Sequence, residues 1–322
     1  MTSSILVTGA TGFVGHAVVI ELAKRGRSII AGVRQDTNDD SFKAPTVVDI
    51  VSLGDLSDEP TFGDVFSSID TVVHCAARAH VMSERGDDLL SIYRKHNTQA
   101  ALNLARQAAT AGVRRFVFIS TIKVNGAQTS LGEPFTEGDV LAPSDPCGAS
   151  KHEAEQGLLE IAQESTMDVV IIRPVLVYGK GVKGNFATMI RLVSSGIPLP
   201  FGQITNKRSL VSLDNLVDLI IACIDHPEAA NQVFLAADGE DVSTTELLRQ
   251  LAQAMGKPSR LIRVPLFVLA ILAAMLGKKA AVQCSLGSLQ VDISKSRSVL
   301  GWQPIVSLEE GLERCFESEK RG

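Results

Sequence analysis

Short apolar segments alternate with longer amphipathic segments through the first half of the chain. Residues 5–7 form the first apolar segment, and residues 14–25 then repeat apolar positions at helical spacing until Gly26. Solidly apolar runs between turn residues are typical of strands that are buried on both faces. Strands are predicted in six places along this half: residues 5–7, 28–33, 47–54, 71–74, 115–120 and 169–172.

The turn after the first apolar segment is rich in glycine. Residues 8–15 read TGATGFVG, with Gly9, Gly12 and Gly15 at intervals of three. Glycine lets the turn be tight, lets backbone approach a pyrophosphate and lets the helix lie against the strand, while the helix N-terminus supplies N–H donors. A plain strand-to-helix turn without a ligand is the alternative. The order of strand, glycines and helix favours a cradle for dinucleotide phosphates.

Repeated strand–helix units with apolar strands imply an α/β fold, a doubly wound parallel sheet of the Rossmann type with right-handed crossovers. After Pro174 the pattern loosens into glycine-rich loops, helices near 213–225 and 244–255, and short strands near 233–235 and 261–264. Two domains are therefore expected. Residues 1–174, joined again by 211–238, form the dinucleotide-binding domain, and residues 175–322 mainly form a smaller C-terminal α/β substrate-binding lobe.

Composition excludes several classes of protein. The 322 residues are 45% hydrophobic and carry a net charge of −5, with lysine and arginine scattered, so a nucleic-acid partner is not expected. The five cysteines are widely separated and form no CxxC pair, which argues against a disulfide framework and against a metal site. The N-terminus shows no export signal. We expect a cytoplasmic protein without a bound metal.

One apolar segment departs from this soluble pattern. Residues 265–276 read PLFVLAILAAML. The segment is too short to span a bilayer, which needs about 20 residues. A buried helix is the favoured interpretation, and a helix in peripheral contact with a membrane or a partner is the alternative.

The end of the second predicted strand bears on the choice of cofactor. An NAD-binding fold usually places Asp or Glu there, to accept hydrogen bonds from the adenosine ribose, but here the strand ends with Val33 and Arg34. A guanidinium suits the 2′-phosphate of NADP(H). The alternative is that Arg34 is a solvated loop residue and Asp36 reaches the ribose. NADP(H) is therefore preferred, and NAD(H) remains possible.

Several further motifs occur in a fixed order along the chain. They are GDL at 54–56, VVHCAA at 72–77, Asn97 within a helix, RP at 173–174 and VYG at 177–179. With the glycine turn, these motifs resemble the extended short-chain dehydrogenase/reductase family, in its nucleotide-sugar branch of UDP-sugar 4-epimerases, dehydratases and 4-keto-sugar reductases. The glycine turn, Arg34 and this resemblance together imply cofactor contacts from Gly9, Thr11, Gly12, Phe13, Val14, Gly15, Arg34, Asp55, Leu56, Ala76, Ala77, Asn97, Ser120, Lys151, Pro174 and Val177.

The same resemblance implies a catalytic group built from a Ser/Thr hydroxyl and a YxxxK pair. Thr121 matches the hydroxyl that hydrogen-bonds the carbonyl oxygen, and Lys151 matches the lysine that holds the nicotinamide ribose and lowers the pKa of the tyrosine. The tyrosine position is Cys147. Its sulfur lies close to the backbone and does not reach where a phenol oxygen would.

Three interpretations of Cys147 are open. It is an engineered or inactivating replacement of a tyrosine, or a natural variant that uses water or Thr121 for proton transfer, or a residue with another task. The residues around it retain the family pattern, which favours the first: Pro143, Pro146, Gly148, Ser150, Lys151 and Glu155. A nucleophilic cysteine would need a histidine partner, for which His74, His80 and His152 are candidates.

The resemblance also implies a nucleotide-sugar substrate. Arg208 is expected on phosphate oxygens, Asn185 on phosphate or sugar, Phe201 against the uracil base, and Lys123 and Val81 near the sugar. A surface salt bridge is the alternative for Arg208.

The segment around Lys123 and Asn125 resembles the subgroup that makes UDP-N-acetyl-6-deoxyhexosamines for bacterial surface polysaccharides. Because reductases mostly consume NADPH, Arg34 favours an NADP(H)-dependent reductase of a UDP-4-keto-6-deoxy-N-acetylhexosamine at C4. The alternatives are a UDP-hexose or UDP-N-acetylhexosamine 4-epimerase and a catalytically silent NADP(H)-binding protein. A homodimer is implied by the resemblance alone.

Overall fold

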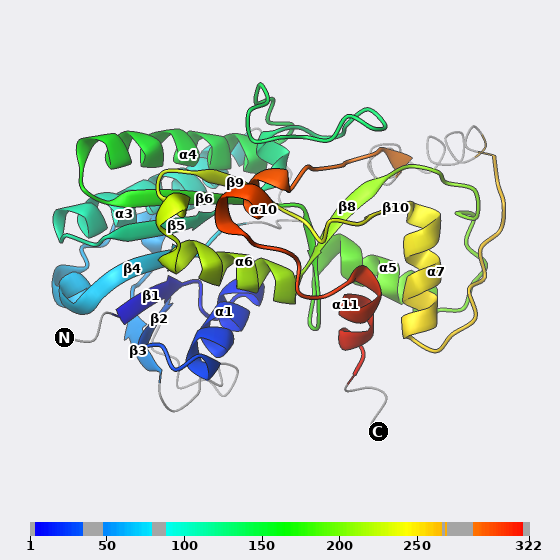
Figure 1. The fold of residues 1–322 in the computed structure, drawn as a ribbon, viewed down its shortest axis with the longest axis horizontal. Coiled ribbons are helices and arrows are strands. Elements are labelled where there is room, and N and C mark those ends of the chain that lie inside the picture. The colour runs from blue at the N-terminus through cyan, green and yellow to red at the C-terminus, as the bar shows by residue number, and fades with distance from the viewer. Residues whose placement is uncertain (1–3, 35–47, 79–87, 266–267, 269–285, 318–322) are drawn as a thin grey trace.

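The computed structural model describes residues 4–34, 48–78, 88–265, 268 and 286–317. Figure 1 shows a large sheet with helices on both of its faces and, beside it, a smaller group of helices and strands that contains the C-terminus. The large sheet has seven strands, all parallel, in the order β3-β2-β1-β4-β5-β6-β9. These are β1 (Ser4–Thr8), β2 (Ile29–Val33), β3 (Asp49–Ser52), β4 (Ile69–His74), β5 (Arg115–Ile119), β6 (Asp168–Pro174) and β9 (Val233–Ala236).

Successive side chains along the strands pack into two separate apolar cores, one on each face of the sheet. Ile5 and Val7 pack with helices α1 (Phe13–Lys24) and α6 (Leu213–Asp225), whereas Leu6 between them packs on the opposite face. That opposite face is covered by α3 (Ala100–Thr110) and α4 (Pro146–Glu164). Burial on both faces is why these strands carry solid apolar runs and no alternation. The predicted α/β fold with a doubly wound parallel sheet is confirmed.

The smaller unit contains a second sheet, of three strands in the order β10-β8-β7. They are β7 (Leu176–Tyr178), β8 (Arg208–Ser212) and β10 (Asp241–Val242), and a third apolar core lies between them and helices α5 (Gly184–Ser194), α7 (Thr244–Ala254) and α11 (Leu308–Arg314). The remaining helical segments are η1 (Leu56–Asp58), η2 (Gly63–Ser68), α2 (Leu89–Tyr93), η3 (Arg94–Gln99), η4 (Ile122–Val124), η5 (Pro227–Ala229) and α10 (Ser294–Leu300).

The strand expected at 261–264 does not form. Leu261 makes an isolated bridge with Leu199, and Ile262 adds backbone hydrogen bonds to Leu199 and Gly202, but the pairing does not extend into a strand. Ile262 stays half exposed because no second element among the described ranges covers it. The boundary between the two domains at residue 174 stays a prediction.

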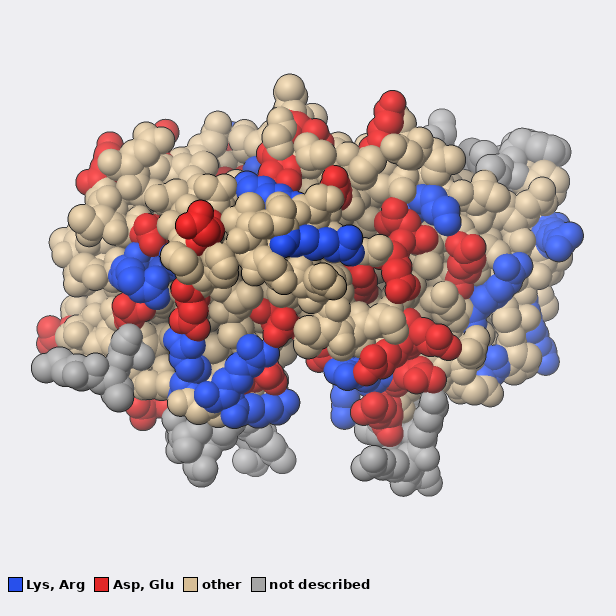
Figure 2. Space-filling view, in the orientation of Figure 1, with Lys and Arg blue, Asp and Glu red and all other residues tan. Residues whose placement is uncertain are grey.

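Charges on the surface are mixed in sign. Figure 2 shows basic and acidic side chains interspersed over the face drawn, without a broad field of one sign. Two ion pairs bind the end of α1 and the following turn to α6: Arg25 to Asp218 at 2.8 Å, and Arg27 to Asp225 at 2.6 Å. Among the described residues no helix is long and apolar enough to cross a bilayer. The apolar segment at 265–276, apart from Pro265 and Val268, lies outside them.

Candidate active site

A cavity of about 440 Å³ opens at the carboxyl ends of β1, β2 and β4, where the strand order reverses. Such a reversal is where open α/β sheets bind their ligands. Gly9 has φ +67°, and a Cβ there would lie 2.7 Å from the backbone nitrogen of Ala76. A Cβ on Gly15 would lie 2.2 Å from the carbonyl oxygen of Gly9. Backbone therefore forms one wall of the cavity, and the site fits a dinucleotide pyrophosphate.

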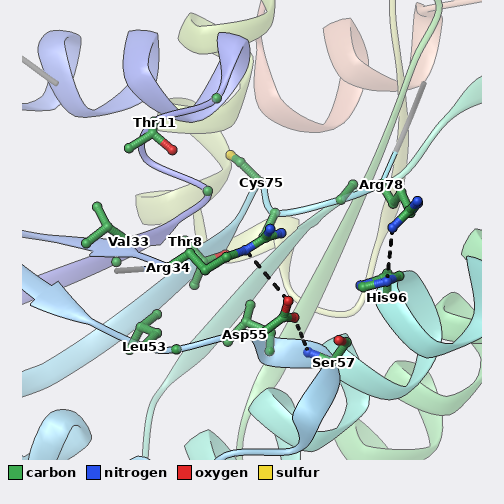
Figure 3. A pocket seen from close by; sticks show the side chains of 17 residues that line it. Thr8, Thr11, Val33, Arg34, Leu53, Asp55, Ser57, Cys75, Arg78 and His96 are labelled. Atoms are coloured by element: carbon green, nitrogen blue, oxygen red, sulfur yellow. Dashed lines mark hydrogen bonds and ion pairs between the residues drawn. The ribbon is translucent and has the colours of Figure 1, made fainter. Parts of the chain in front are cut away.

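Arg34 and Asp55 face one another at one side of this cavity (Figure 3). Arg34 Nε lies 3.8 Å from Asp55 Oδ2, and the Arg34 side chain is 72% exposed. Asp55 also accepts a hydrogen bond from the backbone N–H of Ser57 at 3.0 Å, which holds the pKa of its carboxyl below the usual range. The residue Asp36, the alternative ribose contact, lies outside the described residues.

A second wall was missed by the sequence analysis. Arg78 and His96 line the cavity opposite Arg34, and Arg78 Nη1 lies 3.3 Å from His96 Nε2 (Figure 3). Asn97 holds this wall: its Oδ1 accepts from the backbone N–H of Arg78 at 2.8 Å, and its Nδ2 donates to the Arg78 carbonyl at 3.3 Å. Arg78 directly follows the VVHCAA motif, and that adjacency was the available signal.

The helical segment that carries Asn97 also reaches α4. Asn97 Nδ2 donates to Ser150 Oγ at 3.1 Å, and Thr98 Oγ1 donates to the Ser150 carbonyl at 2.7 Å. Ser150 Oγ in turn donates to the carbonyl of Cys147 at 2.9 Å. Asn97 therefore ties the cavity wall to the first turns of α4, where Cys147 and Lys151 lie.

Cys147 and Lys151 lie in the first turns of α4, beside the carboxyl end of β5, and Thr121 follows that strand. Lys151 is buried, donates from Nζ to the Ile119 carbonyl at 2.8 Å and lies 4.2 Å from the centre of the Phe118 ring. Burial lowers the pKa of its ammonium to about 8. Thr121 precedes η4, and its Oγ1 accepts from the N–H of Lys123 at 3.4 Å.

Cys147 is half-buried at the start of α4, and burial raises the pKa of its thiol. The charges acting on this thiol are Lys123, Asp145 and Lys151, with no histidine among them. His74 instead bonds Thr8 Oγ1 through Nδ1 at 2.8 Å, and burial lowers its pKa to about 3. His80 lies outside the described residues. Within the described part of the chain, nothing supports a cysteine–histidine nucleophile.

The predicted cofactor residues divide into two sets. Eight of them line the cavity: Gly9, Thr11, Gly12, Arg34, Asp55, Leu56, Ala76 and Ala77. The others lie in α1, η3, α4, β6 and β7 or directly after β5, and their contacts with a cofactor stay predictions: Phe13, Val14, Gly15, Asn97, Ser120, Lys151, Pro174 and Val177.

The predicted substrate residues lie apart from this cavity. Lys123 pairs with Asp145 at 2.7 Å. Asp145 is two residues before Cys147, and the charges of both residues act on the Cys147 thiol. Arg208 begins β8 and donates from Nη1 to the Gly287 carbonyl at 3.1 Å, Asn185 is exposed in the first turn of α5, and Phe201 is half-buried against the third core. Val81 lies outside the described residues.

A second cavity, of about 530 Å³, lies beside Lys207, Arg249 and Arg263. None of the predicted substrate residues lines it. The substrate contacts therefore stay predictions.

Comparison with known proteins gives a consistent result. Residues 5–237 match the model of the NAD dependent epimerase/dehydratase family. A UDP-glucose 4-epimerase of Vibrio cholerae is 50% identical over 320 residues, which cover 99% of this chain and 96% of that protein. The structure of MoeE5 in complex with UDP-glucuronic acid and NAD superposes with a TM-score of 0.78 at 25% identity, covering 99% of both chains. A UDP-glucose 4-epimerase from Thermotoga maritima, solved with UDP-glucose, shares the fold with a TM-score of 0.78 at 24% identity and 99% coverage of both.

These findings overturn the reductase predicted from the sequence. One relative that is a reductase, a dTDP-4-dehydro-6-deoxyglucose reductase of Escherichia coli, is 22% identical, against 50% for the 4-epimerase. The prediction went wrong because it drew the direction of the reaction from Arg34 and from the short segment around Lys123. The epimerase that was held as the alternative agrees better with the comparison.

Proposed function

Since this chain belongs to the NAD dependent epimerase/dehydratase family, we propose that it is a UDP-sugar 4-epimerase, with a UDP-hexose as its first candidate substrate. The 50% identity to a UDP-glucose 4-epimerase over the whole chain is the observation that carries the proposal. The MoeE5 structure holds NAD together with UDP-glucuronic acid, and the glycine cavity at the sheet reversal of this chain suits such a cofactor.

Lys151 and Thr121 give the proposed site its chemistry. A bound nicotinamide supplies reversible hydride exchange at a carbinol carbon. The Lys151 ammonium, buried at the end of β5, orients the cofactor ribose and favours negative charge beside it. Thr121 supplies a hydroxyl that hydrogen-bonds the sugar oxygen at C4.

Cys147 is the proposed proton-handling group, in the position that tyrosine has in the family. Epimerisation first oxidises the C4 carbinol, whose hydroxyl proton has to be taken up, and then reduces the ketone, which needs that proton back. We assign the uptake to the Cys147 sulfur in its thiolate form, reached through Thr121 or a water because the sulfur lies close to the backbone, and the return to the thiol so formed. Because burial raises the pKa of the thiol, the thiolate is scarce at neutral pH, and the oxidation half of the reaction is expected to be slow. Lys123 and Asp145 lie beside it, and the Lys123 charge is the strongest one acting on the thiol.

Substitutions of Cys147 test this role. Cys147→Ala is expected to lower kcat about tenfold or more, since it removes the group that takes up and returns the proton. Cys147→Tyr is expected to raise kcat above that of the natural chain, because a phenol oxygen reaches further from the backbone. A kcat of Cys147→Ala equal to that of the unaltered protein would contradict the assignment.

For the cofactor, we propose that the cavity binds NAD and that Arg34 adds affinity for the 2′-phosphate of NADP. The Arg34 guanidinium is mostly exposed, and its ion pair with Asp55 is long, at 3.8 Å. The guanidinium can therefore turn toward a phosphate. Dissociation constants of NAD and NADP, measured by calorimetry for the unaltered protein and Arg34→Ala, test this. Arg34→Ala should weaken NADP severalfold and leave NAD unchanged, and equal weakening of both would contradict the role.

For the sugar nucleotide, we propose that Arg208, Asn185 and Phe201 hold the UDP group. The test is direct: the protein is incubated with UDP-glucose and NAD, and the products are followed by NMR. Redox-neutral appearance of UDP-galactose supports the epimerase. Cofactor binding without conversion of the sugar nucleotide would support the catalytically silent NADP(H)-binding protein. The homodimer and the cytoplasmic location stay predictions.

A further inference from the structure

A buried ion pair lies on α4 and β6, next to the segments that carry Thr121 and Lys151. Arg173 in β6 and Glu155 in α4 are 4% and 3% exposed, and Arg173 donates to both carboxylate oxygens, with Nη2 2.6 Å from Oε2 and Nε 3.0 Å from Oε1. Burying two charges has a desolvation penalty that often equals their attraction, so an apolar pair of similar size is frequently as stable. Stability alone therefore does not account for the pair.

The pair is bonded to further elements. The hydroxyl of Ser120, at the end of β5, donates to Glu155 Oε1. Arg173 Nη1 donates to Asn125 Oδ1 at 3.0 Å, and Asn125 Nδ2 donates to the Thr136 carbonyl at 2.8 Å. A single buried cluster therefore joins α4, β5, β6 and the loop after η4.

These are the segments that carry the proposed chemistry. Ser120 immediately precedes Thr121, and Glu155 lies four residues after Lys151, on the same face of α4. Lys151 Nζ donates to the Ile119 carbonyl at 2.8 Å, one residue before the Ser120 contact with Glu155. Two successive positions at the end of β5 are thus fastened to two successive turns of α4.

We infer that Glu155, held by Arg173 and bonded to Ser120, is a positioning residue that sets the Thr121 hydroxyl and the Lys151 ammonium in their working places. This inference rests on the proposed function. The Glu155 carboxylate is buried and bonded to Arg173 and Ser120, so we assign it no contact with cofactor or substrate and only an effect on Thr121 and Lys151.

The chain offers a matched control on the same two strands. Arg115 at the start of β5 is 2% exposed and pairs with Asp168 at the start of β6, at 3.1 Å. This pair lies at the opposite end of β5 and β6 from Ser120 and Arg173. Asp168→Asn and Glu155→Gln make the same chemical change, a carboxylate to an amide, in an arginine pair.

The experiment compares these two variants with the unaltered protein, at a temperature where circular dichroism shows all of them folded. Glu155→Gln is expected to weaken NAD binding about fivefold and to lower kcat at least about tenfold, with KM for UDP-glucose changed by less than about threefold, since misplaced groups cost rate more than ground-state binding. Asp168→Asn is expected to change each quantity by less than about twofold.

Ser120 provides a milder second test, which also serves if Glu155→Gln does not fold. Ser120→Ala should lower kcat in the same way, Ser120→Thr should restore it, and the Ser120→Ala/Glu155→Gln double variant should lose little more than the worse single variant, because both act in one network. Equal effects of Glu155→Gln and Asp168→Asn, or full activity of Ser120→Ala, would overturn the inference. Cofactor affinity is measured without any sugar, so an unaltered protein that binds NAD but does not convert UDP-glucose fails the proposed function alone.

Discussion

The two ends of strands β5 and β6 each hold a buried arginine bound to a carboxylate, and the two differ in what else the arginine serves. At the amino end, Arg115 donates to Asp168 and to three carbonyl groups at the C-terminal end of α6. At the carboxyl end, Arg173 donates to Glu155, which is bonded to the segment of Thr121. At one edge of the sheet the arginine hydrogen-bonds the free carbonyl groups of a helix end. At the other edge it holds the carboxylate that positions the site groups.

The largest effect is expected from Lys151→Met. Removing the ammonium from the end of β5 should lower kcat by about 10³-fold, in the range of lost acid–base and electrostatic contributions. Lys257→Met is the control, because Lys257 also donates to a carbonyl, that of Ser194 at 3.1 Å, but lies on the surface of the lobe. Steady-state kinetics on UDP-glucose should show loss for the first variant alone, and comparable losses in both would remove the distinction.

At the amino end, Arg115→Met should lower stability and leave catalysis intact. The substitution leaves Asp168 without its arginine partner. It also removes the hydrogen bonds, of 2.8 to 3.1 Å, from Arg115 Nη1 to the carbonyls of Cys223, Ile224 and His226. The free energy of unfolding, from urea titration, should fall by about 3 kcal/mol, as when one partner of a buried pair is removed. A loss of kcat at a temperature where the variant is folded would contradict the comparison.

Gly9→Ala tests the cavity wall with a smaller expected effect. The added methyl meets the Ala76 backbone at 2.7 Å, and φ +67° is unfavourable for alanine. We expect NAD binding about tenfold weaker by calorimetry, as the turn shifts away from its phosphate-binding shape. Gly26→Ala is the matched control, with φ +69° and no atom within 4 Å of the added carbon. Its NAD affinity should not change, and a similar loss there would point to backbone strain alone.

The smallest effect concerns pH. Burial lowers the Lys151 pKa from 10.5 to about 8, so above pH 8 the folded protein binds fewer protons at this site than the unfolded chain. The free energy of unfolding of the unaltered protein, measured against that of Lys151→Met, should therefore rise with pH. The rise should be about 1 kcal/mol between pH 8 and 9 and should end once Lys151 is deprotonated in both the folded and the unfolded chain, near pH 10.5. Cofactor affinity should fall over the same range as the ammonium is lost. Urea titrations of both proteins at pH 7, 8 and 9 measure the difference, and a constant gap would contradict the buried charge.

Much of the carboxyl edge of the sheet was predictable, because its elements follow local rules. Most of the six predicted strands are buried apolar runs, with β3 at the sheet edge the exposed exception, and Gly9, Gly12 and Gly15 between a strand and a helix mark the cradle. The seventh strand, β9, pairs with β6 and extends the sheet. What the sequence did not predict depends on tertiary contacts. Arg78 and His96 come together across 18 residues, and His96 lies in η3, a π-helical turn within the helical run 89–110 that the sequence periodicity does not indicate.

Direction of reaction was the other failure. Arg34 and Lys123 were read as signs of a reductase, although both side chains are paired with nearby carboxylates, Asp55 and Asp145, and neither determines whether a ketone is kept or reduced again. The buried bonds of Ser120 and Glu155 also escaped prediction, since a short motif shows that both residues belong to the family pattern and not that they touch.

The most direct test of the account is the fate of UDP-glucose and NAD with the purified protein, followed together by NMR of the sugar nucleotide and absorbance of the reduced cofactor. The account predicts conversion of UDP-glucose to UDP-galactose without net formation or consumption of reduced cofactor. Stoichiometric oxidation of a reduced cofactor with a 4-keto sugar, together with no interconversion of the two hexoses, would contradict it.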